Sequence, residues 1–130
     1  MTRRKNEQLT PMELEIMNVL WETGAANVQT VQQQLGRPLA YTTVQTVLNI
    51  LLRKGRVKRT LRDRAYFYKP AVSRGRVGRE TLSDLVDRLF GGSAESLVMS
   101  LLEAKHITPE ELARLQRLVK KSQEEHHGND

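Results

Sequence analysis

The fold is decided by residues 41–54, which read YTTVQTVLNILLRK and are followed by Gly55. An α-helix turns by about 100° per residue, so side chains three and four positions apart share a face. On that spacing one side of the segment is aliphatic, formed by Val44, Val47, Leu48 and Leu51. The opposite side is polar, formed by Thr42, Gln45, Thr46, Asn49 and Arg53. We therefore predict a helix from about Tyr41 to Lys54 with one buried and one exposed face.

The exposed face of this helix has an unusual composition. Surface helices commonly carry Glu and Lys, yet no acidic residue occurs anywhere from Leu39 to Thr60. The face offers hydroxyl, amide and guanidinium groups, which can form hydrogen bonds with base edges and phosphates. This composition favours a recognition helix for DNA over a small solvated helix that happens to lack acids.

Two β-prone runs follow the helix. The first is Val57–Leu61 and the second is Ala65–Pro70, and the linker Arg62-Asp63-Arg64 joins them. This pattern predicts an antiparallel hairpin with a basic tip. Three consecutive aromatic residues, Tyr66, Phe67 and Tyr68, are expected in the hydrophobic core and not stacked on bases.

Two further helices are predicted before residue 41. Thr10 and Glu13 have the spacing of a capping box, with Pro11 at the first helical position, and Gly24 ends the helix. Asn27 can cap a second helix. The order of three helices and a hairpin within residues 1–72 is that of a winged helix-turn-helix DNA-binding domain. The predicted fold is therefore mainly α with a small antiparallel hairpin.

Residues 73–130 are predicted to form a separate helical domain. Its three expected helices cover about 74–90, the segment after Ser93 and the segment after Thr108. Short amphipathic helices bury little surface alone, so we expect a second copy of the chain to cover their apolar stripes. A monomer whose helices fold back on the first domain is the alternative. The expected dimerisation residues are Leu82, Leu85, Val86, Leu89, Leu97, Val98, Leu101, Leu102, Leu112, Leu115, Leu118 and Val119.

The charge of the chain is divided between these two parts. The 130 residues carry a net charge of +6. Residues 1–70 hold 12 Lys and Arg against 5 Asp and Glu, whereas residues 71–130 hold 9 against 10. The excess of positive charge therefore lies on the winged part, as expected for a part that meets a polyanion.

Candidate DNA contacts follow from the docking geometry of helix-turn-helix proteins, in which the first turns of the recognition helix meet the bases. The predicted base or near-base contacts are Thr42, Thr43, Gln45 and Thr46. The predicted contacts with the DNA backbone are Tyr41, Asn49, Arg53, Lys54, Arg56, Lys58, Arg59, Arg62 and Arg64, of which Arg62 and Arg64 are expected along phosphates or in a minor groove. Arg3, Arg4 and Lys5 form either a DNA-binding arm or a solubilising tail.

Several other classes of protein do not fit the sequence. Cysteine is absent, which excludes disulfides, thiolate metal sites and a cysteine nucleophile. No catalytic motif occurs, and His126 and His127 beside two acids lack the spacing of a metal site, so we predict no catalytic residues, metal or cofactor. No apolar run reaches the roughly 18 residues of a membrane span, and no signal sequence is evident, so we expect a cytoplasmic protein without membrane insertion.

Two alternative functions remain open on residue patterns alone. A winged-helix module can bind an acidic protein with its basic surface, although it has no need for an acid-free polar helix face. An architectural DNA-binding protein can use the same fold without choosing an operator.

The sequence resembles the penicillinase repressor (BlaI/MecI-type) family of transcriptional regulators. The segments that carry the resemblance are Leu9–Met17 with Val19-Leu20-Trp21, Tyr41–Asn49 with Leu52–Gly55, Tyr66–Pro70 and Leu89–Ser93. The resemblance implies a homodimer that represses transcription from an inverted-repeat DNA operator. It also implies a membrane sensor protease as a partner.

Two branches of the penicillinase repressor family have features that this chain lacks. Repressors of the β-lactam branch are inactivated by cleavage at an Asn-Phe pair, and Ser100-Leu101 stands at the matching place here. The resemblance therefore does not carry this cleavage over. The copper-responsive branch uses C-terminal cysteines, and their absence excludes thiolate copper sensing.

Overall fold

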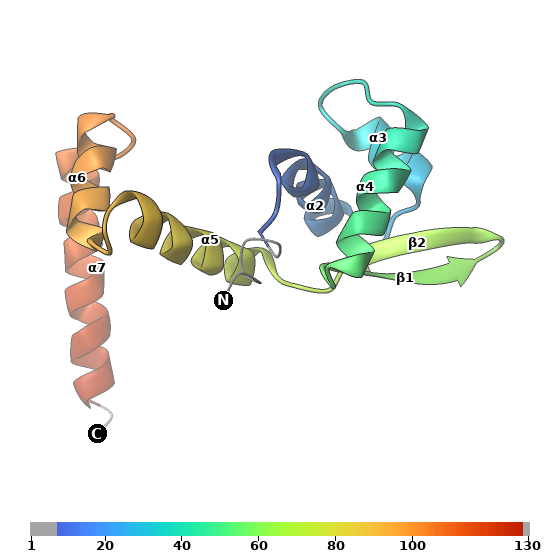
Figure 1. Cartoon of the computed structure of the whole chain (residues 1–130). Coiled ribbons are helices and arrows are strands. Elements are labelled where there is room, and N and C mark those ends of the chain that lie inside the picture. Colours follow the sequence, from blue (N-terminus) through green and yellow to red (C-terminus); the bar gives the residue numbers. More distant parts are fainter. Residues whose placement is uncertain (1–7, 129–130) are drawn as a thin grey trace. The chain divides into compact units, whose positions relative to one another are not determined.

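The computed structural model describes the backbone of residues 8–128 and the side chains of residues 8–125. The chain divides into two compact units, Met1–Thr81 and Leu82–Asp130. The elements in chain order are α2 (Pro11–Thr23), α3 (Val28–Gln34), α4 (Tyr41–Arg53), β1 (Val57–Arg62), β2 (Ala65–Pro70), α5 (Arg74–Leu89), α6 (Ala94–Glu103) and α7 (Pro109–Gly128) (Figure 1). The prediction of a mainly helical chain with one antiparallel hairpin is confirmed for the described residues.

The first unit is built around a core shared by three helices and the hairpin. The aliphatic face of α4 is buried as predicted, with Val44, Leu48 and Leu51 fully inaccessible to solvent. Ile16 and Leu20 of α2 are equally buried. Each such side chain contributes about 1.5–3 kcal/mol through its removal from water. Packing against this core fixes which face of α4 points outward.

The helix starts follow the local sequence signals. Thr10 and Glu13 form the predicted capping box, in which the Glu13 amide donates to Thr10 Oγ1 at 3.1 Å and the Thr10 amide donates to Glu13 Oε1 at 2.8 Å. Asn27 caps α3, because its Oδ1 accepts a hydrogen bond from the Thr30 amide at 2.8 Å. These two predictions are confirmed.

Gly55 ends α4 as predicted. Its φ of 75° is in the left-handed region, which glycine adopts without a steric penalty. The following amide, that of Arg56, donates to the Leu51 carbonyl at 2.9 Å. This turn sends the chain directly from α4 into β1.

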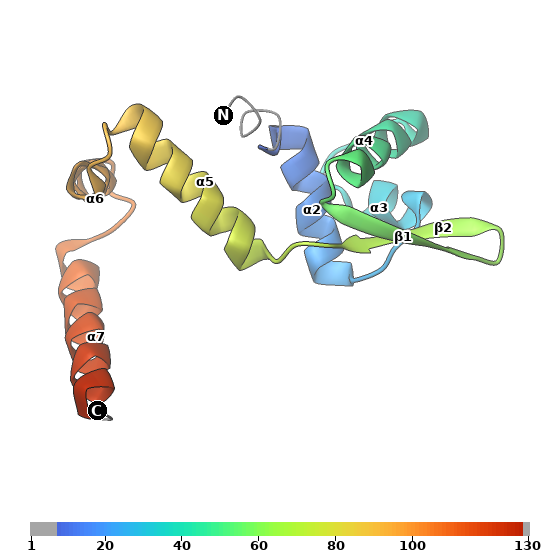
Figure 2. The ribbon, with the colours of Figure 1, turned by 60° about the horizontal axis from the view of Figure 1, so that its bottom comes forward.

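The hairpin has a two-residue turn at its tip. Asp63 and Arg64 both have positive φ, 51° and 69°, as a type I′ turn requires. Strand β1 runs one residue further than predicted, so that Arg62 pairs with Ala65. The hairpin extends away from the three-helix core in both views (Figures 1 and 2). Ala26 also pairs with Tyr68 through two backbone hydrogen bonds of 2.9 and 2.8 Å, which fixes the base of the hairpin beside α3.

The prediction for the three aromatic residues of β2 is confirmed only in part. Tyr68 is buried, with 1% of its surface exposed. Phe67 lies on the other face of the hairpin and is half-buried. The core prediction is wrong for Tyr66, which is 42% exposed. Tyr66 shares a face with Tyr68 but lies two residues nearer to the tip, where the hairpin has passed the edge of the core.

The first turns of α5 pack within the first unit. The Trp21 Nε1–H donates to the Val72 carbonyl at 2.9 Å, and the Arg74 guanidinium lies 5.4 Å from the centre of the Trp21 ring. Val77 is buried. The division between the units consequently falls inside α5, after Thr81, whereas the sequence placed a domain boundary after residue 72.

The second unit contains the end of α5 together with α6 and α7. Ser93 caps α6 by accepting from the Ser96 amide at 3.1 Å, and Thr108 forms a second capping box with Glu111 at the start of α7. From residue 82 to residue 125 no side chain is buried. Leu89 is 69% exposed. None of the predicted stripe residues is buried in a single chain. Leu82, Leu85, Leu89, Leu115, Leu118 and Val119 are exposed, and the half-buried members are Val86, Leu97, Val98, Leu101, Leu102 and Leu112.

No helix in the described part of the chain combines the length and the apolar character needed to cross a membrane.

Candidate nucleic-acid interface

The polar face of α4 points to solvent. Thr42, Gln45, Thr46 and Asn49 are exposed, and Thr43 is half-buried. The helix face that lacks acidic residues therefore lies on the outside of the first unit, as predicted. Hydroxyl and amide groups at this spacing can reach base edges from a helix that lies in a major groove.

The N-terminus of α4 differs from the other helix starts that the structure describes. Side chains accept hydrogen bonds from the first turns of the other helices, namely Thr10, Asn27, Ser73, Ser93 and Thr108. The N-cap of α4 is Ala40, which has no side chain able to do so. The first amides of α4 thus keep free donors, and free amides with a positive helix dipole favour an anion.

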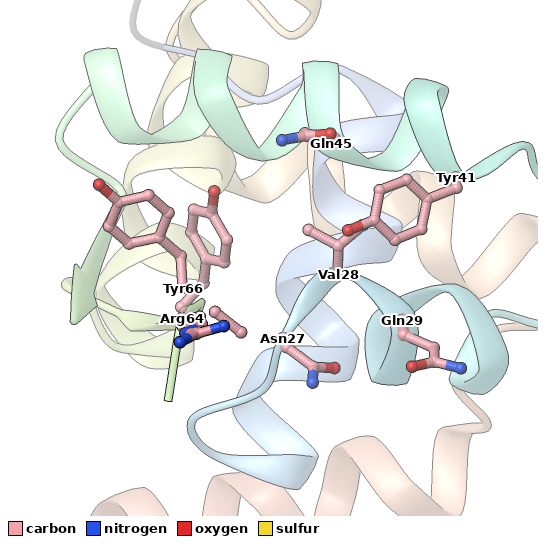
Figure 3. Close-up of a pocket in the computed structure, with 9 residues that line it drawn as sticks. Asn27, Val28, Gln29, Tyr41, Gln45, Arg64 and Tyr66 are labelled. Carbon is pink, nitrogen blue, oxygen red and sulfur yellow. The ribbon is translucent and has the colours of Figure 1, made fainter. Parts of the chain in front are cut away.

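A polar groove lies beside this helix start. It has a volume of about 290 Å³ and runs between α4, the start of α3 and the hairpin. Figure 3 shows Tyr41 and Gln45 along α4, Asn27 by the start of α3, and Tyr66 and Arg64 on the hairpin side. The fold therefore brings together three predicted contact residues, Tyr41, Gln45 and Arg64, from two separate elements.

The hairpin carries exposed cations that reach beyond the core. Arg62 and Arg64 lie exposed at the tip, and Lys58 and Arg59 lie exposed further along β1. Arg53 at the end of α4 is also exposed. These side chains, on both faces of the hairpin and at the end of α4, form a basic edge of the first unit, as a phosphate-binding surface requires.

Sequence reasoning missed two arginine–aromatic contacts on the hairpin. The Arg59 guanidinium lies 3.9 Å from the centre of the Tyr66 ring, and that of Arg62 lies 4.5 Å from the centre of the Phe67 ring. The predicted hairpin register could have indicated both contacts, because it makes each arginine the diagonal neighbour of an aromatic residue on the opposite strand.

Two cations predicted to contact the DNA backbone make contacts inside the protein. The Lys54 ammonium lies 2.9 Å from Glu13 Oε1 and donates to the Gln8 carbonyl at 3.1 Å. The Arg56 guanidinium lies 3.9 Å from Glu80 Oε1, and only 13% of its side chain is exposed. The structure does not bring these two groups to the basic edge.

The turn between α3 and α4 is held by side chains from other elements. Gln32 Nε2 donates to the Leu39 carbonyl at 2.9 Å, and Arg37 donates two hydrogen bonds, of 3.2 and 3.0 Å, to the Glu15 carboxylate. The Arg37 hydrogen bond lowers the pKa of the Glu15 carboxyl below its ordinary value, and the same contact raises the pKa of Arg37. These contacts fix where the recognition helix begins.

The remaining candidate groups give no metal centre in what the structure describes. Residues 8–125 contain no cluster of three or more His, Cys, Asp or Glu side chains placed to hold a metal ion. The side chains of His126 and His127 and the basic residues Arg3, Arg4 and Lys5 lie outside the described residues.

Three packed helices, of which the third has an outward polar face, together with a hairpin wing define the winged helix-turn-helix class of DNA-binding proteins. The chain belongs to the penicillinase repressor family, whose family model matches residues 9–121. It is a DNA-binding transcriptional repressor of the BlaI/MecI type, and the family is not enzymatic. The resemblance identified from the sequence is thereby confirmed.

Relatives with similar sequences span nearly the whole chain. The transcriptional regulator BlaI of Mycobacterium tuberculosis is 32% identical over 129 residues, which cover 96% of this chain and 91% of that protein. The penicillinase repressor of Bacillus licheniformis is 26% identical over 118 residues, covering 89% and 92%. The crystal structure of the YusO protein from Bacillus subtilis shares the fold, with a TM-score of 0.52 at 16% identity, covering 95% of this chain and 79% of that one.

Proposed function

We propose that this repressor binds as a homodimer to an inverted-repeat operator, and that the α4 helix of each copy reads one half-site in the major groove. The observation that carries the dimer is the absence of any buried side chain between residues 82 and 125. Covering those stripes stabilises three short helices that bury little surface alone. A twofold partner covers them and matches a palindromic site.

Base reading is assigned to the exposed groups in the first turns of α4. Gln45 can form paired hydrogen bonds with adenine, and Thr42 and Thr46 can contact base edges or a thymine methyl group. We assign the uncapped amides after Ala40 and the hydroxyl of Tyr41 to a phosphate beside the same groove. Thr43, which is half-buried at the edge of the polar face of α4, is assigned a near-base contact.

Backbone contacts are assigned to the exposed cations of the wing and to the end of α4. The residues assigned to these contacts are Asn49, Arg53, Lys58, Arg59, Arg62 and Arg64. Lys54 and Arg56 are not among them, because their cationic groups face Glu13 and Glu80. Operator binding places the site of action with the genome, in the cytoplasm.

A membrane sensor protease is a further partner that only the family resemblance supports. The residues at the place of the family's cleaved Asn-Phe pair are Ser100-Leu101, and they lie inside α6. Cleavage at this pair is therefore not part of the proposal.

The dimer is tested by sedimentation of the full chain at micromolar concentration. Two copies of 14.9 kDa are expected to move together, and a clean monomer would contradict the proposal. Leu118→Asp should separate them without unfolding, because Leu118 is 57% exposed in the single chain. Lys120→Asp, at an exposed position about 160° around α7 from Leu118, should leave the dimer intact.

Operator choice is tested by selecting bound duplexes from random sequence. An inverted repeat with half-sites about one helical turn apart is expected. Equal enrichment of all sequences would refute sequence-specific binding and favour an architectural DNA-binding protein.

A further inference from the structure

We propose that Tyr66 and Phe67 are positioning residues for DNA binding, whose rings hold Arg59 and Arg62 on opposite faces of the wing with their hydrogen-bond donors free for phosphates. The inference rests on the proposed contact between the wing and the DNA backbone. It assigns a role to two aromatic residues that contribute neither to base reading nor, in the case of Tyr66, to the core.

The placement follows from the register of the hairpin. Arg59 pairs with Tyr68, and Arg62 pairs with Ala65. Tyr66 is therefore the diagonal neighbour of Arg59, and Phe67 is the diagonal neighbour of Arg62. Because successive side chains alternate between the faces of a strand, the two arginine–aromatic pairs lie on opposite faces.

The geometry is that of a cation held by the face of a ring. The distances from guanidinium carbon to ring centre are 3.9 Å for Arg59 and 4.5 Å for Arg62, within the roughly 6 Å range of cation–π attraction. Tyr66 is 42% exposed, so its ring is present at the surface to serve this contact. Figure 3 shows that ring beside the groove that Gln45 also lines.

Stacking leaves the hydrogen-bonding capacity of the arginine unused. The five N–H donors of a guanidinium lie in its plane, whereas a ring contacts its flat face. Arg37 is the contrast, because it commits two of its nitrogens to the Glu15 carboxylate. Neither Arg59 nor Arg62 takes part in an ion pair among the residues that the structure describes.

A held arginine binds a phosphate at a smaller entropic cost than a free one. Long side chains lose rotamer freedom when they are immobilised at an interface, and a side chain fixed beforehand loses less. The two rings therefore prepare the wing for DNA before contact. The face of the hairpin that carries Arg59 and Tyr66 adjoins the groove beside α4, and Arg62 lies on the other face of the hairpin.

The test measures operator binding as a function of salt for the full chain carrying Tyr66→Leu, Tyr66→Phe, Arg59→Gln, or Arg59→Gln together with Tyr66→Leu. Arg59→Gln should lower the salt slope by about 0.9 for one lost phosphate contact. Tyr66→Leu should weaken operator binding about two- to fivefold. Tyr66→Phe retains the ring and should bind as the unchanged protein does.

The double variant decides whether Tyr66 acts through Arg59. Tyr66→Leu should cause no further loss once Arg59 is replaced, since a positioning residue has nothing left to position. An undiminished loss in the Arg59→Gln background, or an equal loss with Tyr66→Phe, would overturn the inference. An unchanged slope with Arg59→Gln would instead overturn the proposed wing contact at that residue, and the inference with it.

The same design applies to the second pair, with Phe67→Leu, Phe67→Tyr and Arg62→Gln. Thermal unfolding of each variant separates loss of folding from loss of positioning. A weaker operator complex at an unchanged unfolding midpoint, restored by Phe67→Tyr and absent in the Arg62→Gln background, is the expected result. Weakening that appears only with a lowered midpoint would contradict a positioning role for Phe67.

Discussion

The Glu13 carboxylate links the start of α2 to the end of α4, because its Oε1 accepts hydrogen bonds from both the Thr10 amide at 2.8 Å and the Lys54 ammonium at 2.9 Å. Glu13 is 3% exposed and lies in the first turn of α2, whereas Lys54 follows the last turn of α4. One side chain therefore caps a helix and fixes the end of the recognition helix beside it.

Replacement of Glu13 should destabilise the protein strongly. Glu13→Ala removes the capping box, worth about 1 kcal/mol, and also leaves a largely buried ammonium without its counterion. We expect a loss of about 2–4 kcal/mol in the free energy of unfolding, measured by urea denaturation. Glu13→Gln keeps the cap but removes the charge, so it should lose less; equal losses for the two variants would show that the cap contributes nothing and that the ion pair accounts for the whole loss.

Lys54 is expected to act on stability and not on DNA affinity. Lys54→Met should lower the free energy of unfolding, because Glu13 then lacks its partner, while the salt slope of DNA binding stays unchanged. The measurement is operator binding between low and moderate salt. A slope reduced by about one unit would instead place Lys54 on a phosphate.

The arginines at the tip of the wing, unlike Lys54, should act on DNA affinity and not on stability. Arg62 and Arg64 are both exposed, so their joint replacement by Gln should change stability little. Loss of two phosphate contacts should lower the salt slope by about 1.8 for any DNA sequence. Arg117→Gln with Lys121→Gln removes the same charge from exposed positions of α7 and serves as the control. An equal effect of the two pairs would mean that net charge alone sets the affinity.

Gln45 should govern the choice of operator more than the strength of nonspecific binding. Its side chain is exposed on α4 and carries no charge. Gln45→Ala should reduce discrimination at one base position of each half-site by about 1–3 kcal/mol, without a change in the salt slope. Competition between the selected operator and single-base variants measures this. Uniform weakening across all of these sequences would argue against base reading by Gln45.

Local signals explain why much of the fold was predictable. The capping box of Thr10 and Glu13 and the apolar face of α4 each depend on residues three or four apart, and the hairpin depends on two short adjacent runs. Sequence patterns report such contacts directly because helix and strand geometry fixes them.

Long-range contacts explain why other features were not predictable. Glu13 meets Lys54 across 41 residues, and Arg37 meets Glu15 across 22. Trp21 reaches the Val72 carbonyl across 51 residues, so the start of α5 packs with the first unit. Tyr66 is exposed because the hairpin extends beyond the core. The hydrophobicity of the strand residues does not show how far the hairpin extends.

The start of α7 should loosen in acid. The Thr108 amide and hydroxyl form hydrogen bonds with Glu111, and they lower the pKa of its carboxyl from the ordinary value of 4.5. A group whose pKa is lower in the folded state stabilises the fold above its unfolded pKa, and this contribution is lost as pH falls through the folded value. Protection of the amides in the first turn of α7 from hydrogen exchange, measured relative to their intrinsic rates at each pH, should therefore fall below about pH 4.5. In Glu111→Gln the neutral side chain should abolish this pH dependence, and its persistence would assign the effect to another group.

Trp21 should control how firmly α5 is attached to the DNA-binding unit. Trp21→Phe removes the N–H that donates to the Val72 carbonyl at 2.9 Å and weakens the ring contact of Arg74. We expect a loss of about 1–2 kcal/mol in the free energy of unfolding. The Val77 amide, which donates to the Ser73 carbonyl at 3.1 Å, should exchange faster with solvent. Amides of α5 beyond Thr81 belong to the second unit and should change little. Equal acceleration along the whole of α5 would show that the helix responds as one body and that Trp21 does not act on its first turns alone.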